Sequence, residues 1–457
     1  MTFLLYTISF LLAAVLNGTA DTIKNNYSLQ NILEIAVKQS NRIQIIENRA
    51  QTDLQQVAIY KAEAYPKIDL SINVGYANQS LLGQPFETSI ILDRIDGFLF
   101  RWAFSLQQPV FKFGQIINSF KLASLTKKMA QKSNALQRNN FFLEVIEQFM
   151  IAFTGQSDYL ISNQTFNRSQ RIFERTSLDF ETGRVSKREL LRTEASLEGD
   201  RASLLSSASN RSLSIKKLNV LIGLPDSADY FLILDDGDSF LQIPSSYSHV
   251  QNQQVALKRL ETETNRYLRK NAWSAFFPSI DLTGSIFNEF MAVDTSGLTE
   301  LLPLPTDGEV IPEIPVSSDL FNPDLINYSI GLQLSWNIFD GKRSWAQYNQ
   351  YKLQEKTTRV ELEQLERENS NQIQEIKNQI SVTDNTIAAY RLQLEASQKA
   401  LHQADSDFQD GFIDAISYLE IEQEYRSAAR NLDNEKLRHL LLLAQLRIAL
   451  GMSIYGE

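Results

Sequence analysis

Cysteine is absent from this chain of 457 residues, and histidine occurs only three times. Without cysteine, the chain forms no disulfide, no thiolate metal site and no cysteine nucleophile. The three histidines lie far apart in the sequence and match no metal-binding motif. Positive charge is also scarce, because 44 basic residues face 54 acidic ones and leave a formal charge of −10. We therefore expect no metal and no nucleic-acid partner.

Long apolar runs are missing as well. Beyond residue 20 no run of about 18 apolar residues occurs, so any insertion into a membrane has to use strands rather than helices. The apolar stretch Phe3 to Leu16 is short, and Gly18-Thr19-Ala20 provides the small residues that precede a cleavage site. The sequence predicts a signal peptide over residues 1–20. Because no basic residue precedes the run, an uncleaved membrane anchor is the alternative.

The chain does contain an internal repeat with a constant offset of 228 residues. Leu106–Lys112 aligns with Leu334–Asp340, and Phe180–Gly183 aligns with Phe408–Gly411. A helix tolerates no net insertion without rotating its apolar stripe, so the gapless alignment predicts long helices of fixed length. We predict two structural repeats, over residues 21–235 and 236–457.

Each repeat alternates between two periodicities. Helical spacing predicts helices over about 28–64, 114–183, 183–223 and 248–278. Period-2 alternation predicts four strands, two per repeat, which begin near Ile68, Phe98, Ile280 and Tyr328; the fourth extends to Ile338. The segment from about 290 to 325 is rich in proline, aspartate and glycine and reads as an irregular surface loop.

The strands are about ten residues long, which is the length of a bilayer-crossing strand in a barrel. Half-buried strands of a soluble sandwich alternate in the same way, although sandwiches need more than four strands. Four strands cannot close a barrel, and lipid does not tolerate open strand edges. A membrane location therefore predicts an oligomer, and the number of copies stays open between two, three and four.

Several short motifs occur twice, in the same order and at matching spacing. They are the prolines between helix and strand, Pro66 and Pro278, the turns before Gly114 and Gly341, the hairpin tips at Gly183 and Gly411, and the helix ends at Gly223 and Gly451. Over the whole mature chain this set resembles the TolC-type outer-membrane efflux proteins. The resemblance implies a mainly α fold with a transmembrane β-barrel portion. In that fold two repeats of helix, two strands, long helix and helix assemble as a homotrimer, whose 12-stranded barrel continues into an α-helical tunnel.

The function implied by this resemblance is a passive exit duct. Such a channel lies in the outer membrane of a Gram-negative bacterium, with most of its chain in the periplasm. It docks with a periplasmic adaptor (membrane fusion) protein and an inner-membrane transporter to export small molecules or, in type I secretion, proteins. It uses no cofactor and performs no chemical reaction. The alternative is a periplasmic coiled-coil scaffold or adaptor without a pore; an enzyme is disfavoured because no phosphate loop or nucleophile motif is present.

The resemblance also assigns roles to residues. The hairpin tips are the expected adaptor contacts, although their glycines also suit simple helix caps; the tip residues are Thr182, Gly183, Arg184, Ser186, Asp410, Gly411 and Asp414. Ser417 and Glu420 occupy the two positions where the family places acidic rings at the pore constriction. Only Glu420 is acidic, and a solvated helix face that includes Glu422 and Glu424 is the alternative.

The closed state and the barrel lumen complete the assignment. Phe408 and Ile413 stand where the family often has a tyrosine and an arginine that lock the gate, so we expect packing of Phe408 and Phe412 instead. The polar faces of the strands are expected to line the lumen and the aromatic faces to meet lipid. The expected lumen residues are Lys67, Asp69, Ser71, Asn73, Arg101, Asp281, Thr283, Ser285 and Gln333. The cargo does not follow from the sequence.

Overall fold

The computed structural model describes residues 26–79, 95–234, 241, 243, 252–293 and 326–455. The predicted signal peptide over 1–20 and most of the predicted loop over 290–325 lie outside these residues. The chain forms two compact units, and each unit draws on both predicted repeats. The helical unit comprises 1–52, 129–259 and 360–457, and the sheet unit comprises 53–128 and 260–359. The two compact units are therefore not the two predicted repeats, which meet at residues 235 and 236.

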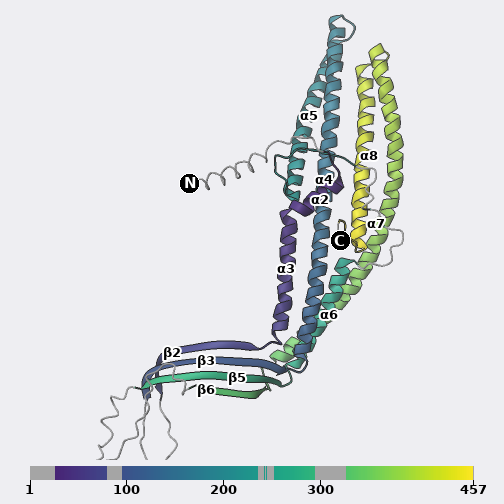
Figure 1. Cartoon of the computed structure of the whole chain (residues 1–457). Helices are drawn as coiled ribbons and strands as arrows, with labels where there is room; N and C mark the ends of the chain where they lie inside the picture. Colours follow the sequence, from purple (N-terminus) through teal and green to yellow (C-terminus); the bar gives the residue numbers. More distant parts are fainter. Residues whose placement is uncertain are drawn as a thin grey trace, which may run out of the picture. The chain divides into compact units, whose positions relative to one another are not determined.

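The sheet unit contains four antiparallel strands in the order β2-β3-β5-β6 (Figure 1). Their bounds are Lys67–Gln79 for β2, Ile95–Phe111 for β3, Ser279–Val293 for β5 and Asn327–Ser335 for β6. All four predicted strands are present, but several of their ends differ from the prediction. β5 continues to Val293, so the loop does not begin at Phe290. β6 ends at Ser335 rather than Ile338, because its partner strand begins at Ser279, directly after Pro278.

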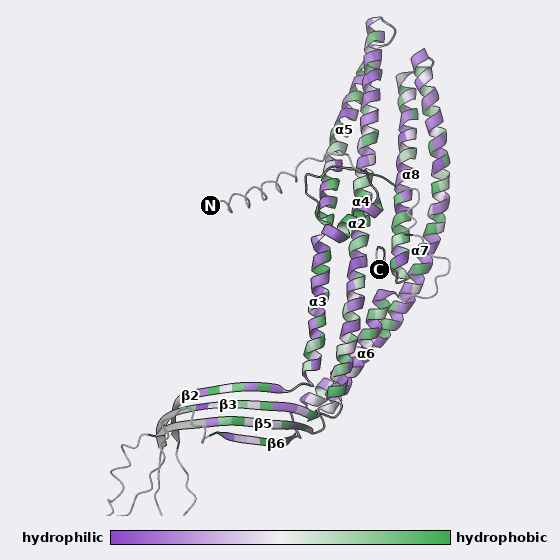
Figure 2. Ribbon diagram, in the orientation of Figure 1, coloured by the Kyte–Doolittle hydropathy of each residue, from purple (hydrophilic) through white to green (hydrophobic). Residues whose placement is uncertain are grey.

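The strand register gives the sheet two faces of opposite character. Asp69, Ser105, Ser285 and Ser329 lie in one row across the four strands, and the next row consists of Leu70, Phe104, Ile286 and Tyr328. Figure 2 shows hydrophobic and hydrophilic bands following one another along β2. Because side chains alternate between faces, these rows put a polar face and an apolar face on opposite sides of the sheet. β2 and β6 are its two edge strands.

The helices are long and mostly match the predicted ranges. They are α2 (Leu29–Gln39), α3 (Asn41–Ala62), α4 (Gln115–Glu181), α5 (Lys187–Ile222), α6 (Gln253–Ser274), α7 (Arg343–Asp410) and α8 (Ala415–Ala449). Within the described ranges, no helix combines the length and the apolar character needed to cross a membrane.

The helix predicted over 28–64 is in fact two helices, separated at Ser40. Ser40 has an extended backbone (ψ 126°), and its hydroxyl donates to the Leu221 carbonyl oxygen 2.8 Å away. At the end of α5, Gly223 has a φ of 86°, and a Cβ there would lie only 2.4 Å from the Gln39 oxygen. The break therefore lets the chain pass close to the end of α5, where only glycine fits.

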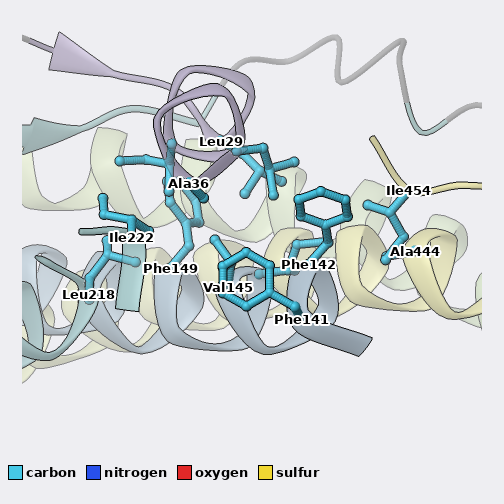
Figure 3. Packing of buried hydrophobic residues seen from close by; sticks show 14 of the residues in the cluster. Leu29, Ala36, Phe141, Phe142, Val145, Phe149, Leu218, Ile222, Ala444 and Ile454 are labelled. Atoms are coloured by element: carbon cyan, nitrogen blue, oxygen red, sulfur yellow. The ribbon is translucent and has the colours of Figure 1, made fainter. Parts of the chain in front are cut away.

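The largest hydrophobic core lies in the helical unit, between α2, α4, α5 and α8. Figure 3 shows Leu29 and Ala36 of α2 packed with Val145 and Phe149 of α4 and Ile222 of α5. Two short strands, β1 (Asn26–Tyr27) and β4 (Phe231–Leu232), pair in parallel beside this core; the sequence did not reveal them. The core holds together segments from both ends of the chain, since buried Ile454 belongs to it as well.

Candidate functional site

The first hairpin tip is a capped turn between α4 and α5. The Arg184 amide donates to the Asp179 carbonyl oxygen at 2.8 Å, and Gly183 adopts a φ of 73°. This is the glycine-dependent end of a helix, which satisfies backbone carbonyl groups that the helix leaves free. Ser186 then caps α5 by accepting a hydrogen bond from the Glu189 amide. Thr182, Gly183, Arg184 and Ser186 are all exposed, so this tip presents a hydrogen-bonded turn on the protein surface.

The second tip, between α7 and α8, has the same construction. The Phe412 amide donates to the Asp407 carbonyl oxygen at 2.7 Å, and Gly411 has a φ of 80°. Asp414 caps α8 through the Ser417 amide at 2.8 Å, and hydrogen bonding from Ser417 lowers the pKa of Asp414. Asp410, Gly411 and Asp414 are exposed. The glycines therefore act as helix caps in both tips, and the exposed positions remain available for a partner.

Close to the second tip, α8 separates its acidic residues onto different faces. Glu420 and Glu424 are exposed and four residues apart, so they share a face of the helix with half-buried Ser417. Glu422 is fully buried. The three glutamates therefore do not share one solvated face, because Glu422 is buried while Glu420 and Glu424 are exposed. Glu420 has an exposed carboxylate on the face that Ser417 also occupies, and it forms no ion pair with the residues that the structure describes.

Buried Glu422 forms an ion pair across to α4. Arg168 Nη1 lies 3.1 Å from Glu422 Oε1, and the Thr165 hydroxyl donates to the same oxygen at 3.3 Å. Burial opposes the positive charge of Arg168, but the hydrogen bond and charge of Glu422 raise its pKa overall. Nearby, the Tyr418 hydroxyl donates to Asp405 at 2.6 Å; burial and this hydrogen bond raise the pKa of Tyr418.

The two phenylalanines that we expected to pack together are separate in this chain. Phe408 packs against Tyr418, with ring centroids 5.4 Å apart, and the Arg175 guanidinium lies over the Phe408 ring at 5.2 Å from its centroid. Phe412 is 79% exposed. Within the single chain, Tyr418 of α8 therefore takes the place that we expected Phe412 to fill.

The register places the expected lumen residues on the polar face of the sheet. Lys67 lies opposite Gln107, Asn73 opposite Arg101, and Asp281 opposite Gln333. Of the nine expected lumen residues, Thr283 and Ser285 are half-buried, and six are exposed, namely Lys67, Asp69, Ser71, Asn73, Arg101 and Gln333. Asp281 is only 5% exposed, and its Oδ1 lies 3.9 Å from Lys112 Nζ. It thus neutralises a lysine at the base of the sheet rather than lining an open surface.

Sequence reasoning missed Arg168, Glu422 and the Tyr418–Asp405 pair. A usable signal existed, because Glu422 lies four residues after Tyr418 on the buried stripe of α8, where an apolar residue is the rule. A charged residue on such a stripe requires a partner. Its partner, however, lies 254 residues away on another helix, and no local pattern identifies it.

A protein-family model for the outer membrane efflux protein family matches this chain twice, over residues 32–224 and 246–452. Among characterised proteins, the alkaline protease secretion protein AprF of Pseudomonas aeruginosa is 21% identical over 355 residues, covering 76% of this chain and 69% of AprF.

Solved structures with the same fold include two bacterial outer membrane proteins. The Campylobacter jejuni CmeC outer membrane channel superposes with a TM-score of 0.74 at 16% identity, covering 94% of this chain and 87% of CmeC. The outer membrane protein VceC of Vibrio cholerae superposes with a TM-score of 0.73 at 14% identity, covering 93% of this chain and 97% of VceC.

Proposed function

Because the chain belongs to the outer membrane efflux protein family, we propose that it is a passive exit duct across the outer membrane. Three copies would close one 12-stranded barrel from their four-stranded sheets, and their helices would form a tunnel in the periplasm. The duct catalyses no reaction. It receives its cargo from an inner-membrane transporter through a periplasmic adaptor protein.

The observation that carries this proposal is the amphipathic sheet with two free edges. Along its apolar face, Leu70, Tyr328 and Leu332 are 55%, 81% and 71% exposed in the single chain. So large an apolar surface needs a cover, and lipid supplies one. The edge strands β2 and β6 must then pair with other copies, because lipid cannot satisfy their backbone groups. A periplasmic scaffold without a pore leaves this face unexplained.

The tips and α8 supply the remaining parts of the proposed duct. The two capped tips are hydrogen-bonded and exposed, which suits docking onto an adaptor, and we assign the adaptor contact to Arg184, Gly183, Gly411 and their exposed neighbours. We assign the constriction to Glu420, with Ser417 beside it. Three copies of Glu420 would form a ring of carboxylates that attracts cations.

The cargo is the part of the proposal that depends on a relative alone. AprF carries the name of an alkaline protease secretion protein. That name favours an exported protein as the cargo of this chain, handled by a type I secretion system, over a small molecule.

The first experiment is fractionation of expressing cells, followed by native mass measurement of the detergent-extracted protein. We expect recovery in the outer membrane at about three times the chain mass of 52.1 kDa, less the signal peptide. A soluble periplasmic monomer would refute the barrel and leave the scaffold alternative standing.

A second experiment tests the seam between copies. The chain has no cysteine, so engineered cysteines act without background. A cysteine at Ile330 on β6, combined in turn with cysteines at Ile68, Ile72 and Val74 on β2, should give disulfide-linked dimers and trimers for one register. Leu282→Cys with Leu332→Cys is the matched control, because these residues face each other within one chain and should give no ladder. The absence of a ladder from every β2 position would contradict closure through these edges.

A further inference from the structure

The end of β3 and the turn that follows β6, both in the sheet unit, carry matching pairs of exposed apolar residues. Val110 and Phe111 are 54% and 47% exposed, and Ile338 and Phe339 are 81% and 80% exposed. The pairs are related by the 228-residue repeat. Ile338 is in phase with the apolar residues Leu332 and Leu334 of β6, which are 71% and 65% exposed, and Phe339 follows it directly. The uncovered surface is therefore continuous with the apolar face of the sheet.

The turn between β3 and α4 and the turn between β6 and α7 each contain a non-glycine residue with a left-handed backbone, namely Phe113 (φ 43°) and Lys342 (φ 70°). Such a conformation costs energy and persists only where something stabilises it or uses it. Phe113 has a visible compensation, since its ring stacks on Phe277 at a centroid distance of 4.1 Å. Lys342 is exposed instead, so packing within the chain does not explain its conformation.

The second turn places two free positive charges beside its apolar pair. Lys342 and Arg343 are exposed, and neither has an ion-pair partner among the residues that the structure describes. The acid nearest in sequence, Asp340, is engaged elsewhere, because it accepts hydrogen bonds from the Ser344 amide at 2.8 Å and the Ser344 hydroxyl at 2.5 Å. In a chain of net charge −10, this turn is a local basic site directly next to exposed hydrophobic side chains.

Three of the four tryptophans of the chain lie in the segments next to these turns: Trp273 at the end of α6, against Phe277, Trp336 directly after β6, and Trp345 in the first turn of α7. Trp273, Trp336 and Trp345 are 48%, 55% and 61% exposed, and the Trp336 indole donates to the Phe276 carbonyl oxygen at 3.1 Å. Half-exposed indole rings are typical of the boundary between a membrane and water, where one end of the ring is apolar and the other is hydrated. The fourth, Trp102, lies within β3 on the apolar face.

We propose that the turn from Ile338 to Arg343 is a binding site for anionic phospholipid at the periplasmic leaflet of the outer membrane. Ile338 and Phe339 enter the acyl chains, and Lys342 and Arg343 bind the phosphate of a glycerophospholipid with a net negative headgroup. The proposal rests on the proposed function, because the sheet has to be in the membrane. It goes further in naming a lipid class and the residues that select it.

Lipid fits this surface better than a protein partner does. The apolar residues continue the face that the proposed barrel already turns to lipid, and the basic pair lies at its aqueous end, in the order of a leaflet: acyl chains, then phosphate. Attraction of basic residues to an anionic leaflet strengthens binding about fivefold per residue. Loss of both charges should therefore weaken the preference for anionic lipid by roughly an order of magnitude or more.

The depth of the tryptophans tests the location. The purified oligomer is reconstituted into phosphatidylcholine vesicles whose acyl chains carry bromine at shallow or at deep carbons. In Trp102→Phe, emission comes from Trp273, Trp336 and Trp345, and shallow bromine should quench it most. In the triple variant Trp273→Phe/Trp336→Phe/Trp345→Phe, emission comes from Trp102, and deep bromine should quench it most.

These two variants separate failure of this inference from failure of the proposed function. If lipid bromine quenches Trp102 but aqueous iodide alone quenches the other three, the duct stands and the anchoring turn is refuted. If bromine quenches neither set, the sheet is not in the membrane, and the proposed function fails as well.

Competition between spin-labelled phosphatidylglycerol and spin-labelled phosphatidylcholine tests the selectivity. The wild-type oligomer should prefer phosphatidylglycerol, and Lys342→Gln/Arg343→Gln should lose that preference by about tenfold or more. Lys352→Gln/Lys356→Gln is the matched control, since it removes the same charge from exposed positions further along α7. An unchanged preference in the first variant, with an intact oligomer by native mass, would refute the phosphate site.

Discussion

The buried ion pair between α4 and α8 makes a quantitative prediction, because its two partners differ in their access to water. The Glu422 side chain is 0% exposed, whereas that of Arg168 is 21% exposed. Removal of Arg168 leaves a carboxylate with no cation and no solvent. Removal of the charge of Glu422 leaves a guanidinium that still reaches water. The two substitutions should therefore have unequal effects, although they break the same contact.

The expected magnitudes follow from this asymmetry. Arg168→Met should cost about 3–5 kcal/mol of local stability, the usual effect of stranding a buried charge. Glu422→Gln keeps an acceptor for Arg168 and Thr165, so it should cost only about 1–2 kcal/mol. The double variant Arg168→Met/Glu422→Leu replaces the pair with apolar side chains and should return close to wild type.

Amide hydrogen exchange in the detergent-extracted protein measures these costs locally, since it reports the free energy of opening for individual segments. The exchange rate changes about tenfold for each 1.4 kcal/mol of opening free energy. Arg168→Met should therefore speed exchange near residues 165–172 and 418–425 by roughly a hundredfold to a few thousandfold. Glu422→Gln should speed it by about tenfold. Equal effects of the two single variants, or a double variant as impaired as Arg168→Met, would refute the argument from burial.

Three further predictions concern other parts of the chain. Glu420→Gln should lower the cation selectivity of single channels in planar bilayers. Glu194→Gln, which changes an exposed glutamate of α5, should leave that selectivity unchanged. Equal effects of the two substitutions would show that Glu420 does not line the constriction. Burial raises the pKa of Asp433, so the protonated residue stabilises the fold at low pH, and this contribution is lost as the pH rises through the raised pKa. Asp433→Asn should therefore slow hydrogen exchange in α8 at pH 7. At acidic pH the same substitution should give no gain. Gly223→Ala should lower the stability of the fold by more than about 2 kcal/mol, because the left-handed φ disfavours alanine and the added Cβ clashes with the end of α2; recovery of the oligomer should fall. Gly199→Ala within α5 is the control, since its added Cβ meets nothing, and it should raise stability by up to about 1 kcal/mol.

The elements of the fold follow from periodicity, but their ends depend on tertiary contacts. The alternation of the second predicted strand begins near Phe98, yet β3 begins at Ile95 and continues past Pro109 to Phe111. Pro109 remains in the sheet because the register shifts beside it, between Pro109 and Phe111, and an irregularity of this kind tolerates the missing amide. The break at Ser40 has no proline or glycine to announce it, since it depends on a carbonyl of α5.

In the candidate site, too, some residues can be predicted from local sequence and others depend on tertiary contacts. Gly183 and Gly411 are readable from sequence because a helix end with a left-handed residue is a local requirement. The face of Glu420 also follows from helical spacing. Arg168 and Glu422 do not, because their pairing depends on which helices lie side by side, and that information comes from the whole assembly of helices.

The two compact units alternate along the sequence, and this arrangement affects how the chain folds during export. Each unit needs segments from both halves of the chain, and the sheet joins the halves through β3 and β5. During synthesis and export, the amino-terminal half therefore emerges without the partners that complete either unit, and neither can finish folding until the carboxyl-terminal half has crossed the inner membrane. Because both halves lie in one polypeptide, each first-half segment has its second-half partners within the same chain and does not depend on meeting a second molecule.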